Sequence, residues 1–341
     1  MKAALFDEID SITLIDKDIP EAKPNEAVLK VITTGICGSE IHAYKGTHPF
    51  RKPPSVLGHE AVGIIEKLGS DVSDFNIGDT VTIEPHYGCG ECRECLAGDY
   101  HLCNQKTVLG TKKWDGSFAE YMAVPASTMY KLPESLSPSV GVLAEPLAVG
   151  VHAVKKADVQ KGDKVAVLGA GPIGLLTAVA ARSAGAETIC ITDALEHNLA
   201  AGKKIGATDA VNVKEESIVD YVHEHVGSVD KVFVTIGLKS AADEALHIVK
   251  KKGKIVSIAI FEGDTGIDLN KVFMSEIEII GSSMYVKEDF EQAISILQED
   301  KYPLDILTKH QFPMDEINTA MSVAQTKKDG AIKVLINPSH S

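Results

Sequence analysis

The pattern of apolar and polar positions divides the chain into two parts with different secondary structure. Up to about residue 145 the apolar runs are short, and turn residues such as Gly, Asn and Asp end them. Strands are predicted at 26–33, 60–68 and 80–83, because β-branched residues dominate these runs and no helical period is sustained. This part is therefore expected to be mostly β, with long loops that carry functional residues.

After residue 163 the pattern changes, and compact apolar strands alternate with helices. Strands are predicted at 164–168, 188–193, 210–213, 231–235, 254–260 and 277–281. One helix is predicted after the glycine-rich turn that follows the first of these strands, and it ends near Gly185. Further helices are predicted at 147–155, 196–205, 217–226, 241–249, 288–298 and 314–326, before a last strand at 331–336. Strands that alternate with helices are typical of a doubly wound parallel sheet, so the predicted fold class is α/β.

Length and charge exclude several classes of function. A chain of 341 residues suggests about two domains. The 34 Lys and Arg residues and 48 Asp and Glu residues give a net charge of −14, which argues against nucleic acid or a membrane as the main partner. Because we find neither a bilayer-spanning apolar run nor a signal peptide, we expect a cytoplasmic protein. The six cysteines are then expected to be metal ligands or buried thiols.

One group of cysteines has the spacing of a structural zinc site. Two, two and seven residues separate its four members, which are Cys89, Cys92, Cys95 and Cys103. Four thiolates at such spacing are typical of a closed tetrahedral zinc site. The alternatives are an iron–sulfur cluster, which the spacing and Asn104 in place of Pro disfavour, and two disulfides, which a cytoplasmic location disfavours.

A second metal site is predicted around Cys37, His59 and Glu60. Thiolate, imidazole and carboxylate ligands together suit Zn²⁺, and three protein ligands with an open position are typical of catalytic zinc. In isolation, a buried cysteine near a helix-capping histidine is the alternative. Glu145, directly before Pro146, either caps the following helix or is directed at a metal.

A glycine-rich turn after the strand at 164–168 predicts a dinucleotide site. The turn reads Gly169-Ala170-Gly171-Pro172-Ile173-Gly174 and opens a helix. The first glycine permits the tight turn, the second lets the backbone approach a pyrophosphate, and the third allows close packing of helix on strand. Asp193 ends the next strand 19 residues after Gly174, where an acid binds ribose hydroxyls and repels a 2′-phosphate. NAD is therefore favoured over NADP, with a helix cap as the alternative role for Asp193. Cys190 in the same strand is expected to be a buried thiol.

Taken together, these motifs resemble those of the zinc-dependent medium-chain alcohol dehydrogenases over nearly the whole chain. The similarity is greatest to the polyol (sorbitol), butanediol and threonine dehydrogenase branch. The segments that carry it are Cys37-Gly38-Ser39, His42, Gly58-His59-Glu60, the cysteines from 89 to 103, Glu145-Pro146-Leu147 and Gly169 to Gly174. The resemblance implies a GroES-like, β-rich catalytic domain from residues 1–148 and 286–341. A Rossmann NAD-binding domain from residues 149–285 is inserted in it, and the active site is expected in the interdomain cleft.

The resemblance also assigns ligands to the catalytic zinc. Cys37 and His59 match the two ligands common to the family, and Glu60 matches the acidic ligand. Glu145 matches a carboxylate that binds zinc or its water, and which of the two glutamates is the third direct ligand is left open. One catalytic and one structural zinc per chain are thus expected, together with NAD.

Further residues match the proton relay or depart from the family pattern. Ser39 and His42 match a relay from substrate to solvent, and Tyr44 occupies a position that often touches substrate. Glu40 stands where Asp is usual, at a position expected to orient the zinc-binding histidine. Asn198 stands where a basic residue often contacts the adenosine ribose.

The implied reaction is oxidation of a secondary alcohol of a sorbitol-like polyol to a ketone, with hydride transfer to NAD. Alternative substrates are 2,3-butanediol, L-threonine and a sugar-alcohol phosphate. A non-enzymatic, crystallin-like NAD-binding relative is the alternative from another class. The zinc-free quinone reductase branch is set aside, because it lacks the cysteine group and the metal ligands.

Two expectations concern partners. Arg51 and Lys52, on the predicted loop before His59, are typical of solvated surface, and contact with a sugar phosphate is the alternative. The resemblance favours a homotetramer or homodimer, with a small alcohol or polyol as the other partner.

Overall fold

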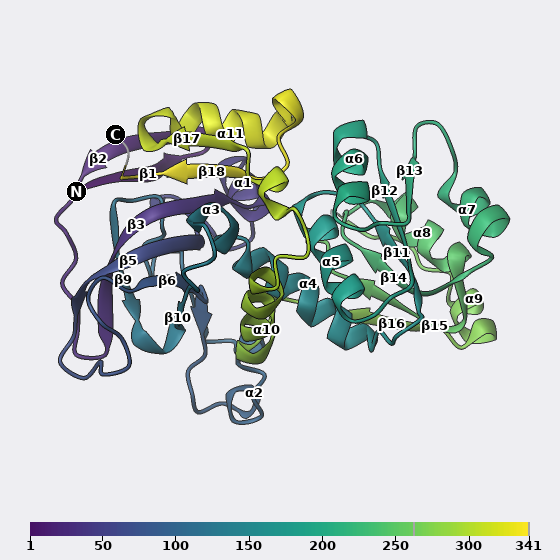
Figure 1. The fold of residues 1–341 in the computed structure, drawn as a ribbon, viewed down its shortest axis with the longest axis horizontal. Helices are drawn as coiled ribbons and strands as arrows, with labels where there is room; N and C mark the ends of the chain where they lie inside the picture. The colour runs from purple at the N-terminus through teal and green to yellow at the C-terminus, as the bar shows by residue number, and fades with distance from the viewer. Residues whose placement is uncertain (262, 340–341) are drawn as a thin grey trace. The chain divides into compact units, whose positions relative to one another are not determined.

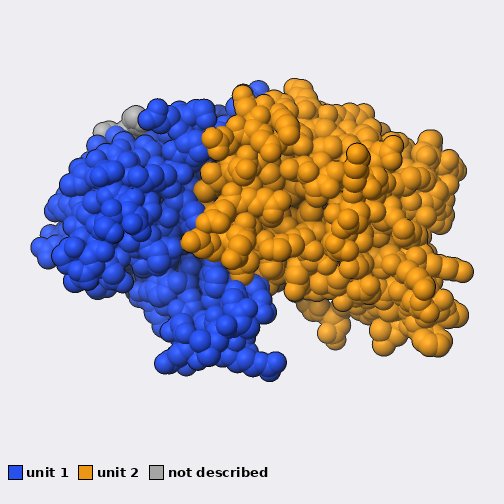
Figure 2. Space-filling view, turned by 60° about the horizontal axis from the view of Figure 1, so that its bottom comes forward, with its two compact units in different colours: residues 1–145, 305–341 blue, residues 146–304 orange. Residues whose placement is uncertain are grey.

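The computed structural model describes residues 1–261 and 263–339. The chain forms two compact units, which Figure 2 distinguishes by colour. Unit 1 contains Met1–Glu145 and Asp305–Ser341, and unit 2 contains Pro146–Leu304. Within the described ranges, each helix is too short or too polar to cross a membrane.

A seven-stranded sheet is the framework of unit 1 (Figure 1). Its order is β10-β6-β5-β3-β18-β17, with β9 also paired to β3. The strands are β3 (Glu26–Ile36), β5 (Glu60–Leu68), β6 (Thr80–Ile83), β9 (Tyr121–Pro125), β10 (Met129–Lys131), β17 (His310–Pro313) and β18 (Val334–Asn337). In Figure 1 the yellow β18 lies beside the purple β3, to which it pairs antiparallel. The C-terminal end of the chain therefore completes a sheet that the N-terminal part begins.

A smaller sheet with the order β2-β1-β4 completes the β structure around the core of unit 1. Its strands are β1 (Lys2–Glu8), β2 (Ser11–Asp16) and β4 (Ser55–Val56). Phe6, Leu57, Phe118 and Met321 are buried in one apolar cluster, to which α11 (Ile317–Thr326) contributes. The short helix α1 (Gly38–Tyr44) follows β3 after the single residue Cys37, and the short helix α3 (Pro138–Gly141) follows the loop after β10.

The segment between β6 and β9 has little apolar core of its own. It contains the two-stranded ribbon of β7 (His86–Tyr87) and β8 (Thr107–Val108), the single turn α2 (Arg93–Leu96) and the four spaced cysteines. Leu96 is 76% exposed and Leu102 is 48% exposed, so neither side chain forms a core here. Covalent or metal cross-links are what such a segment needs to hold one conformation.

Six parallel strands form the sheet of unit 2, in the order β13-β12-β11-β14-β15-β16. They are β11 (Lys164–Leu168), β12 (Thr188–Asp193), β13 (Asp209–Asn212), β14 (Val229–Val234), β15 (Val249–Ser257) and β16 (Glu278–Gly281). Numbered along the chain, this order is 3-2-1-4-5-6, the arrangement of Rossmann dinucleotide-binding domains. The predicted α/β fold class with a doubly wound parallel sheet is confirmed.

Helices connect these strands and pack on the sheet, as α5 does on β11 and β12 and α8 does on β14 and β15. The helices are α4 (Ala144–Ala157), α5 (Pro172–Ser183), α6 (Glu196–Lys204), α7 (Ile218–Tyr221), α8 (Lys239–Ile248), α9 (Leu269–Ser275) and α10 (Lys287–Gln298). Strand β11 is an uninterrupted apolar run after Lys164 because its residues are buried.

The compact units and the predicted domains divide the chain at different residues. Helix α10 lies in unit 2, although the predicted catalytic domain includes residues 286–341. Asp289 on this helix is fully buried, lies 2.6 Å from His152 Nδ1 and accepts a hydrogen bond from Lys155 Nζ at 3.2 Å. These polar contacts join α10 to α4 within unit 2. The predicted domain boundaries, which follow family resemblance, stay a prediction.

Local differences from the predicted elements have identifiable causes. The predicted helix at 217–226 is divided into α7 and a π-helical turn at Val222–Val226, which ends at Gly227 with φ of 88°. Helix α8 runs directly into β15 at Val249, earlier than the predicted strand at 254–260. Helix α1 was not predicted, because its seven residues are too few to show a period.

We expect Gly174→Ala to destabilise unit 2, because an added Cβ would lie 1.8 Å from the carbonyl oxygen of Gly169. Overpacking of this kind costs about 1–3 kcal/mol of unfolding free energy, or roughly 2–10 °C in Tm for a unit of this size. Calorimetric Tm is the measurement. Gly171→Ala is the matched control, since no atom lies within 4 Å of its added Cβ. Equal Tm values for the two variants would contradict the close packing of α5 on β11.

Candidate active site

Cys37 lies at the point where β3 ends and α1 begins. It is the N-cap residue of α1, in extended backbone conformation. Its backbone N–H donates to Oε2 of Glu40 at 3.0 Å, which satisfies one of the free donors at the helix start. The thiol position is therefore fixed by both the strand and the helix.

His59 lies directly before β5, and its ring is oriented by Glu40. Nδ1 of His59 lies 2.6 Å from Oε1 of Glu40, so Nε2 is the nitrogen left to bind a metal. Burial alone would raise the pKa of Glu40, but His59 and Arg51 outweigh it and lower the pKa to about 2. Burial likewise opposes protonation of His59, but the Glu40 carboxylate raises its pKa well above the usual value. Metal binding at Nε2 would therefore release a proton.

The preceding glycine makes the turn into β5 feasible. Gly58 has φ of 93°, a left-handed conformation that favours glycine. A Cβ at this position would also lie 2.6 Å from atoms of Phe118 and Ser117.

Glu60 forms a buried ion pair with Lys333. The lysine Nζ lies 2.6 and 2.8 Å from the two carboxylate oxygens and donates to the carbonyl of Ile36 at 3.2 Å. Burial alone would lower the pKa of Lys333, but the Glu60 carboxylate outweighs it and raises the pKa. Gly35 leaves the space for this carboxylate, since a Cβ there would lie 1.9 Å from its Oε2.

Glu145 is not a helix cap. Helix α4 begins at Ala144, so Glu145 lies inside its first turn, and its side chain is buried. One oxygen each of Glu60 and Glu145 and one ring nitrogen of His59 lie within 4.8 Å of one another. A second group of three, also within 4.8 Å, combines His59 with Cys37 and Glu40. His59 thus belongs to both groups, and the four predicted ligands are brought together around it.

Ser39 and His42 lie three residues apart on α1, on one face of the helix. Oγ of Ser39 is buried and has no hydrogen-bond partner within residues 1–261 and 263–339. A buried hydroxyl without a partner costs free energy, so a group bound beside it would be a favourable partner. His42 is half-buried, and its Nδ1 lies 3.1 Å from Oγ1 of Thr47. The Tyr44 hydroxyl, in contrast, donates to the carbonyl of Asp10 at 2.6 Å.

The four spaced cysteines converge in unit 1. Their Sγ atoms lie within 4.8 Å of one another, and all six cysteines of the chain are free thiols. The backbone N–H of Cys95 donates to Sγ of Cys92 at 3.5 Å, and that of Gln105 donates to Sγ of Cys103 at 3.3 Å. Four convergent sulfurs with N–H donors fit a tetrahedral zinc ion, and the disulfide alternative is not observed.

In unit 2 the glycine-rich turn has the features expected of a pyrophosphate site. Gly169 has φ of 103°, and Gly171 is the N-cap residue of α5 with open space around it. Pro172 takes the first helical position, where its missing N–H costs nothing. The N-terminus of α5 thus presents backbone donors without a side chain in front of them.

Asp193 at the end of β12 is held by three hydrogen bonds. Its Oδ2 accepts from the backbone N–H of Ala170 and from Nδ2 of Asn198, both at 3.0 Å, and its Oδ1 accepts from the N–H of Leu195 at 2.9 Å. Asn198, which stands where the family pattern often has a basic residue, is 4% exposed. Its hydrogen bond fixes the orientation of the Asp193 carboxylate.

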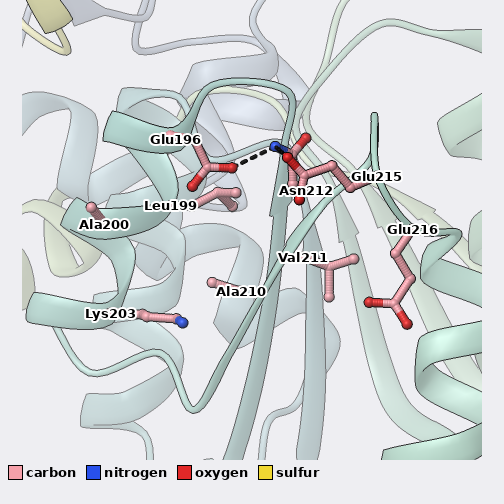
Figure 3. A pocket seen from close by; sticks show the side chains of 9 residues that line it. All are labelled: Glu196, Leu199, Ala200, Lys203, Ala210, Val211, Asn212, Glu215 and Glu216. Atoms are coloured by element: carbon pink, nitrogen blue, oxygen red, sulfur yellow. Dashed lines mark hydrogen bonds between the residues drawn. The ribbon is translucent and has the colours of Figure 1, made fainter.

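A cavity of about 300 Å³ adjoins this edge of the sheet (Figure 3). Asn212, at the end of β13, is the register partner of Asp193 and donates a hydrogen bond to Glu196 on α6. Glu215 and Glu216 also line the cavity, and Figure 3 shows their side chains on the side of β13 opposite α6. The surroundings of Asp193 are thus acidic, with Lys203 as the cation among the lining residues.

Sequence reasoning missed two residues of the site and misjudged a third. Lys333 gave no signal, because it lies 273 residues from Glu60 in the sequence. His48 was not singled out, although its Nδ1 accepts from the N–H of Arg51 at 3.0 Å, and burial and the Arg51 charge lower its pKa to about 4. The expectation that Arg51 is solvated surface was wrong, because its side chain is 3% exposed and its Nη1 lies 3.7 Å from Glu40.

Comparisons with known proteins agree with this geometry. Residues 23–134 match the alcohol dehydrogenase GroES-like domain, and residues 172–299 match the zinc-binding dehydrogenase family. The chain is 33% identical over 347 residues to the sorbitol dehydrogenase of Bacillus subtilis (strain 168), with 99% of this chain and 98% of that protein covered. It is 34% identical over 339 residues to the L-threonine 3-dehydrogenase of Shewanella woodyi (strain ATCC 51908 / MS32), with 96% of each covered.

Among solved structures, a zinc-binding dehydrogenase from Sinorhizobium meliloti 1021 with bound NADP is similar to this chain. The TM-score is 0.93 at 30% identity, and 99% of each chain is covered. The two matched domains, the full-length relatives and the two convergent groups of metal-binding residues agree with one another. The chain belongs to the zinc-dependent medium-chain alcohol dehydrogenase family, in its polyol and threonine dehydrogenase branch, and is an oxidoreductase that uses zinc and a nicotinamide dinucleotide.

Proposed function

We propose that this enzyme oxidises a secondary alcohol of a sorbitol-like polyol to a ketone and transfers the hydride to NAD. The observation that carries the proposal is that Cys37, Glu60 and Glu145 lie around His59 in two groups of candidate ligands. Two residues after Cys37, the buried hydroxyl of Ser39 has no hydrogen-bond partner among the described residues. The sorbitol dehydrogenase relative, similar over its whole length, supports a polyol as the substrate. Because the metal ligands and the relay residues are all present, a non-enzymatic role is not favoured.

Cys37, His59 and one carboxylate, Glu60 or Glu145, would hold the catalytic zinc. When bound, zinc supplies a positive charge that lowers the pKa of a substrate hydroxyl. Glu40 keeps the His59 ring in the orientation that leaves Nε2 free, and Lys333 balances the charge of Glu60. Cys89, Cys92, Cys95 and Cys103 would hold the structural zinc.

The chain's own residues would move the substrate proton. Ser39 Oγ is suited to accept it first, because this buried oxygen has unused hydrogen-bonding capacity among the described residues. His42 lies one helical turn further along α1 and is half-buried, so it can pass the proton to solvent. Gly169, Gly171, Pro172, Ile173 and Gly174 would position the dinucleotide whose nicotinamide takes the hydride.

The acidic surroundings of Asp193 support NAD over NADP. The fixed carboxylate of Asp193 can accept hydrogen bonds from ribose hydroxyls, and a 2′-phosphate there would meet Asp193 and the nearby Glu196, Glu215 and Glu216. The NADP found in the Sinorhizobium meliloti relative is a property of that protein.

Exposed apolar side chains support a homo-oligomer, either a dimer or a tetramer. Strand β16 is an edge of the parallel sheet. On α9, which precedes it, Leu269 is 72% exposed, Phe273 is 81% exposed and Met274 is 70% exposed. An unpaired edge strand and large exposed apolar side chains each mark a surface suited to a second copy of the chain. We also propose that the enzyme is located in the cytoplasm.

We expect NADH formation with sorbitol or xylitol, and slower or no formation with 2,3-butanediol and L-threonine, in initial-rate assays of the zinc-loaded enzyme. Cys37→Ser should lower kcat/KM by roughly 10³-fold or more and reduce bound zinc from two ions per chain to one. Cys190→Ser, which changes a buried thiol of β12, is the control and should keep both ions. If Cys37→Ser had the same kcat/KM as the wild type, Cys37 would not be a ligand of the catalytic metal.

We expect Glu40→Gln to weaken zinc binding at the catalytic site by about 10–100-fold. The neutral amide is a weaker hydrogen-bond acceptor for Nδ1 of His59 than the carboxylate, and it makes the ring a less basic metal ligand. Competition with a chromogenic chelator measures this affinity directly. Glu40→Asp restores the residue usual in the family and keeps the charge, so its affinity should stay closer to that of the wild type. Equal affinity of Glu40→Gln and the wild type would show that the negative charge of Glu40 has no role in metal binding.

We expect Asp193→Gly to shift cofactor preference toward NADP. Loss of a charge-assisted hydrogen bond costs about 1.5–3 kcal/mol, or roughly 10–100-fold in the ratio of kcat/KM values for NAD and NADP. Asp300→Gly removes the same charge from unit 2 at a residue whose φ of 49° suits glycine, so it serves as the control. An unchanged ratio in Asp193→Gly would assign the helix-capping role to Asp193 instead.

A further inference from the structure

A cavity of about 570 Å³ in unit 1 has an unusual concentration of positive charge. None of the described residues that line it is acidic. Four of them are lysines, namely Lys52, Lys106, Lys112 and Lys113. Within the part of the chain that the structure describes, none of these lysines forms an ion pair. Such a cluster stands out in a chain whose net charge is −14.

The positive charge of the four lysines exceeds the negative charge of the neighbouring cysteine site. Cys103 also lines the cavity, and a zinc ion held by four thiolates carries a net charge of about −2. Four ammonium groups therefore leave a surplus of positive charge around the cavity. A concave surface with one sign of charge concentrates ligands of the opposite sign.

The walls of this cavity are tied to the catalytic centre through Arg51. Phe50 and Lys52 line the cavity on either side of Arg51 in the sequence. Nη1 of Arg51 donates to the carbonyls of Leu109 and Gly110 at 2.8 and 2.9 Å. These two residues lie between Val108 and Thr111, which also line the cavity. The buried guanidinium therefore clamps the two walls together.

The same guanidinium reaches the residue that orients the metal ligand. Arg51 Nη1 lies 3.7 Å from Glu40 Oε1, and that oxygen lies 2.6 Å from Nδ1 of His59. Two consecutive contacts thus join the cavity walls to His59. Phe50 adds an exposed ring that can cover a carbon chain, while the lysines supply the donors for an anion.

We propose that this lysine-lined cavity binds the anionic group, a phosphate ester or a carboxylate, of a polyol substrate. The inference rests on the proposed function, since it names the chemical class of the alcohol oxidised at the same site. It also separates two residues that the sequence presented as a pair. Arg51 is a buried structural clamp, whereas Lys52 is exposed, lines the cavity and donates from Nζ to the carbonyl of Gly46 at 3.2 Å.

The test compares three substrates that share a hexitol chain: sorbitol, a hexitol phosphate and a hexonate. We expect higher kcat/KM for an anionic substrate, and the better of the two anions identifies the group. Lys112→Gln/Lys113→Gln should reduce that preference by roughly tenfold, mainly through KM, and leave sorbitol turnover unchanged. The preference of the wild type should also shrink as ionic strength rises. The double variant Lys67→Gln/Lys204→Gln, which removes two exposed lysines outside the cavity, is the matched control.

A binding measurement separates this inference from the proposed function. Inorganic phosphate, titrated calorimetrically into the zinc-loaded protein, should bind the wild type and the control variant and bind Lys112→Gln/Lys113→Gln more weakly. Turnover of sorbitol with no anion preference would overturn the inference and keep the proposed function. The enzyme could also turn over none of the three substrates and still bind phosphate in a way that depends on Lys112 and Lys113. This result would overturn the polyol function and support the anion site. Loss of zinc in the lysine variant without loss of phosphate binding would assign these lysines to charge balance of the cysteines and overturn the inference.

Discussion

The buried ion pair between Glu60 and Lys333 is the interaction on which the organisation of unit 1 depends. It joins two residues that are 273 positions apart, one at the start of β5 and the other directly before β18. A buried charge that loses its partner costs about 3–5 kcal/mol, so neither residue is tolerable without the other. The C-terminal segment must therefore return to the N-terminal sheet after the chain has built unit 2. The pair acts together with apolar packing, since Met314, Ile317, Met321 and Ile336 of the C-terminal segment are buried in the same core as Phe6 and Leu57.

Charge balance extends from this pair through the whole metal-binding region. Three carboxylates, Glu40, Glu60 and Glu145, are buried near His59, and isolated charges in such surroundings would be neutralised instead of staying ionised. Glu40 remains charged because His59 and Arg51 lie against it and lower its pKa, and Glu60 has the ammonium group of Lys333 as its partner. The longer side chain of Glu40, compared with the Asp usual in the family, bonds both His59 Nδ1 and the N–H of Cys37. One residue thus positions two of the proposed metal ligands.

The sequence was informative where chemistry is local and uninformative where contacts are distant. The strands at 60–68, 80–83, 164–168 and 188–193 were predicted with the boundaries observed, because apolar periodicity and flanking glycines are local signals. The spacing of the four cysteines and the glycine-rich turn likewise predicted groups that the structure brings together. Lys333 and Arg51 could not be recognised, since only tertiary structure shows that their charges are buried. Glu145 was ambiguous for the same reason, because a residue before proline can precede a helix or, as here, lie in its first turn.

The cations near the metal-binding residues and the cavity are of two kinds: buried side chains that contact carboxylates, and exposed lysines that line the cavity. Arg51 and Lys333 are buried, and each contacts a carboxylate of the metal-binding region, so their charges are compensated within the chain. Lys112 and Lys113 are exposed, and they gather around one cavity although the chain carries 14 more acidic than basic residues. Dispersed lysines would serve solubility equally well, and clustering them raises their mutual repulsion. That repulsion is relieved when an anion occupies the cavity, and Arg51 would transmit the ordering of the cavity walls to Glu40 and His59. The contacts of Arg51 with Glu40 and of Glu40 with His59 thus join the walls of the proposed anion site to the metal-binding residues within unit 1.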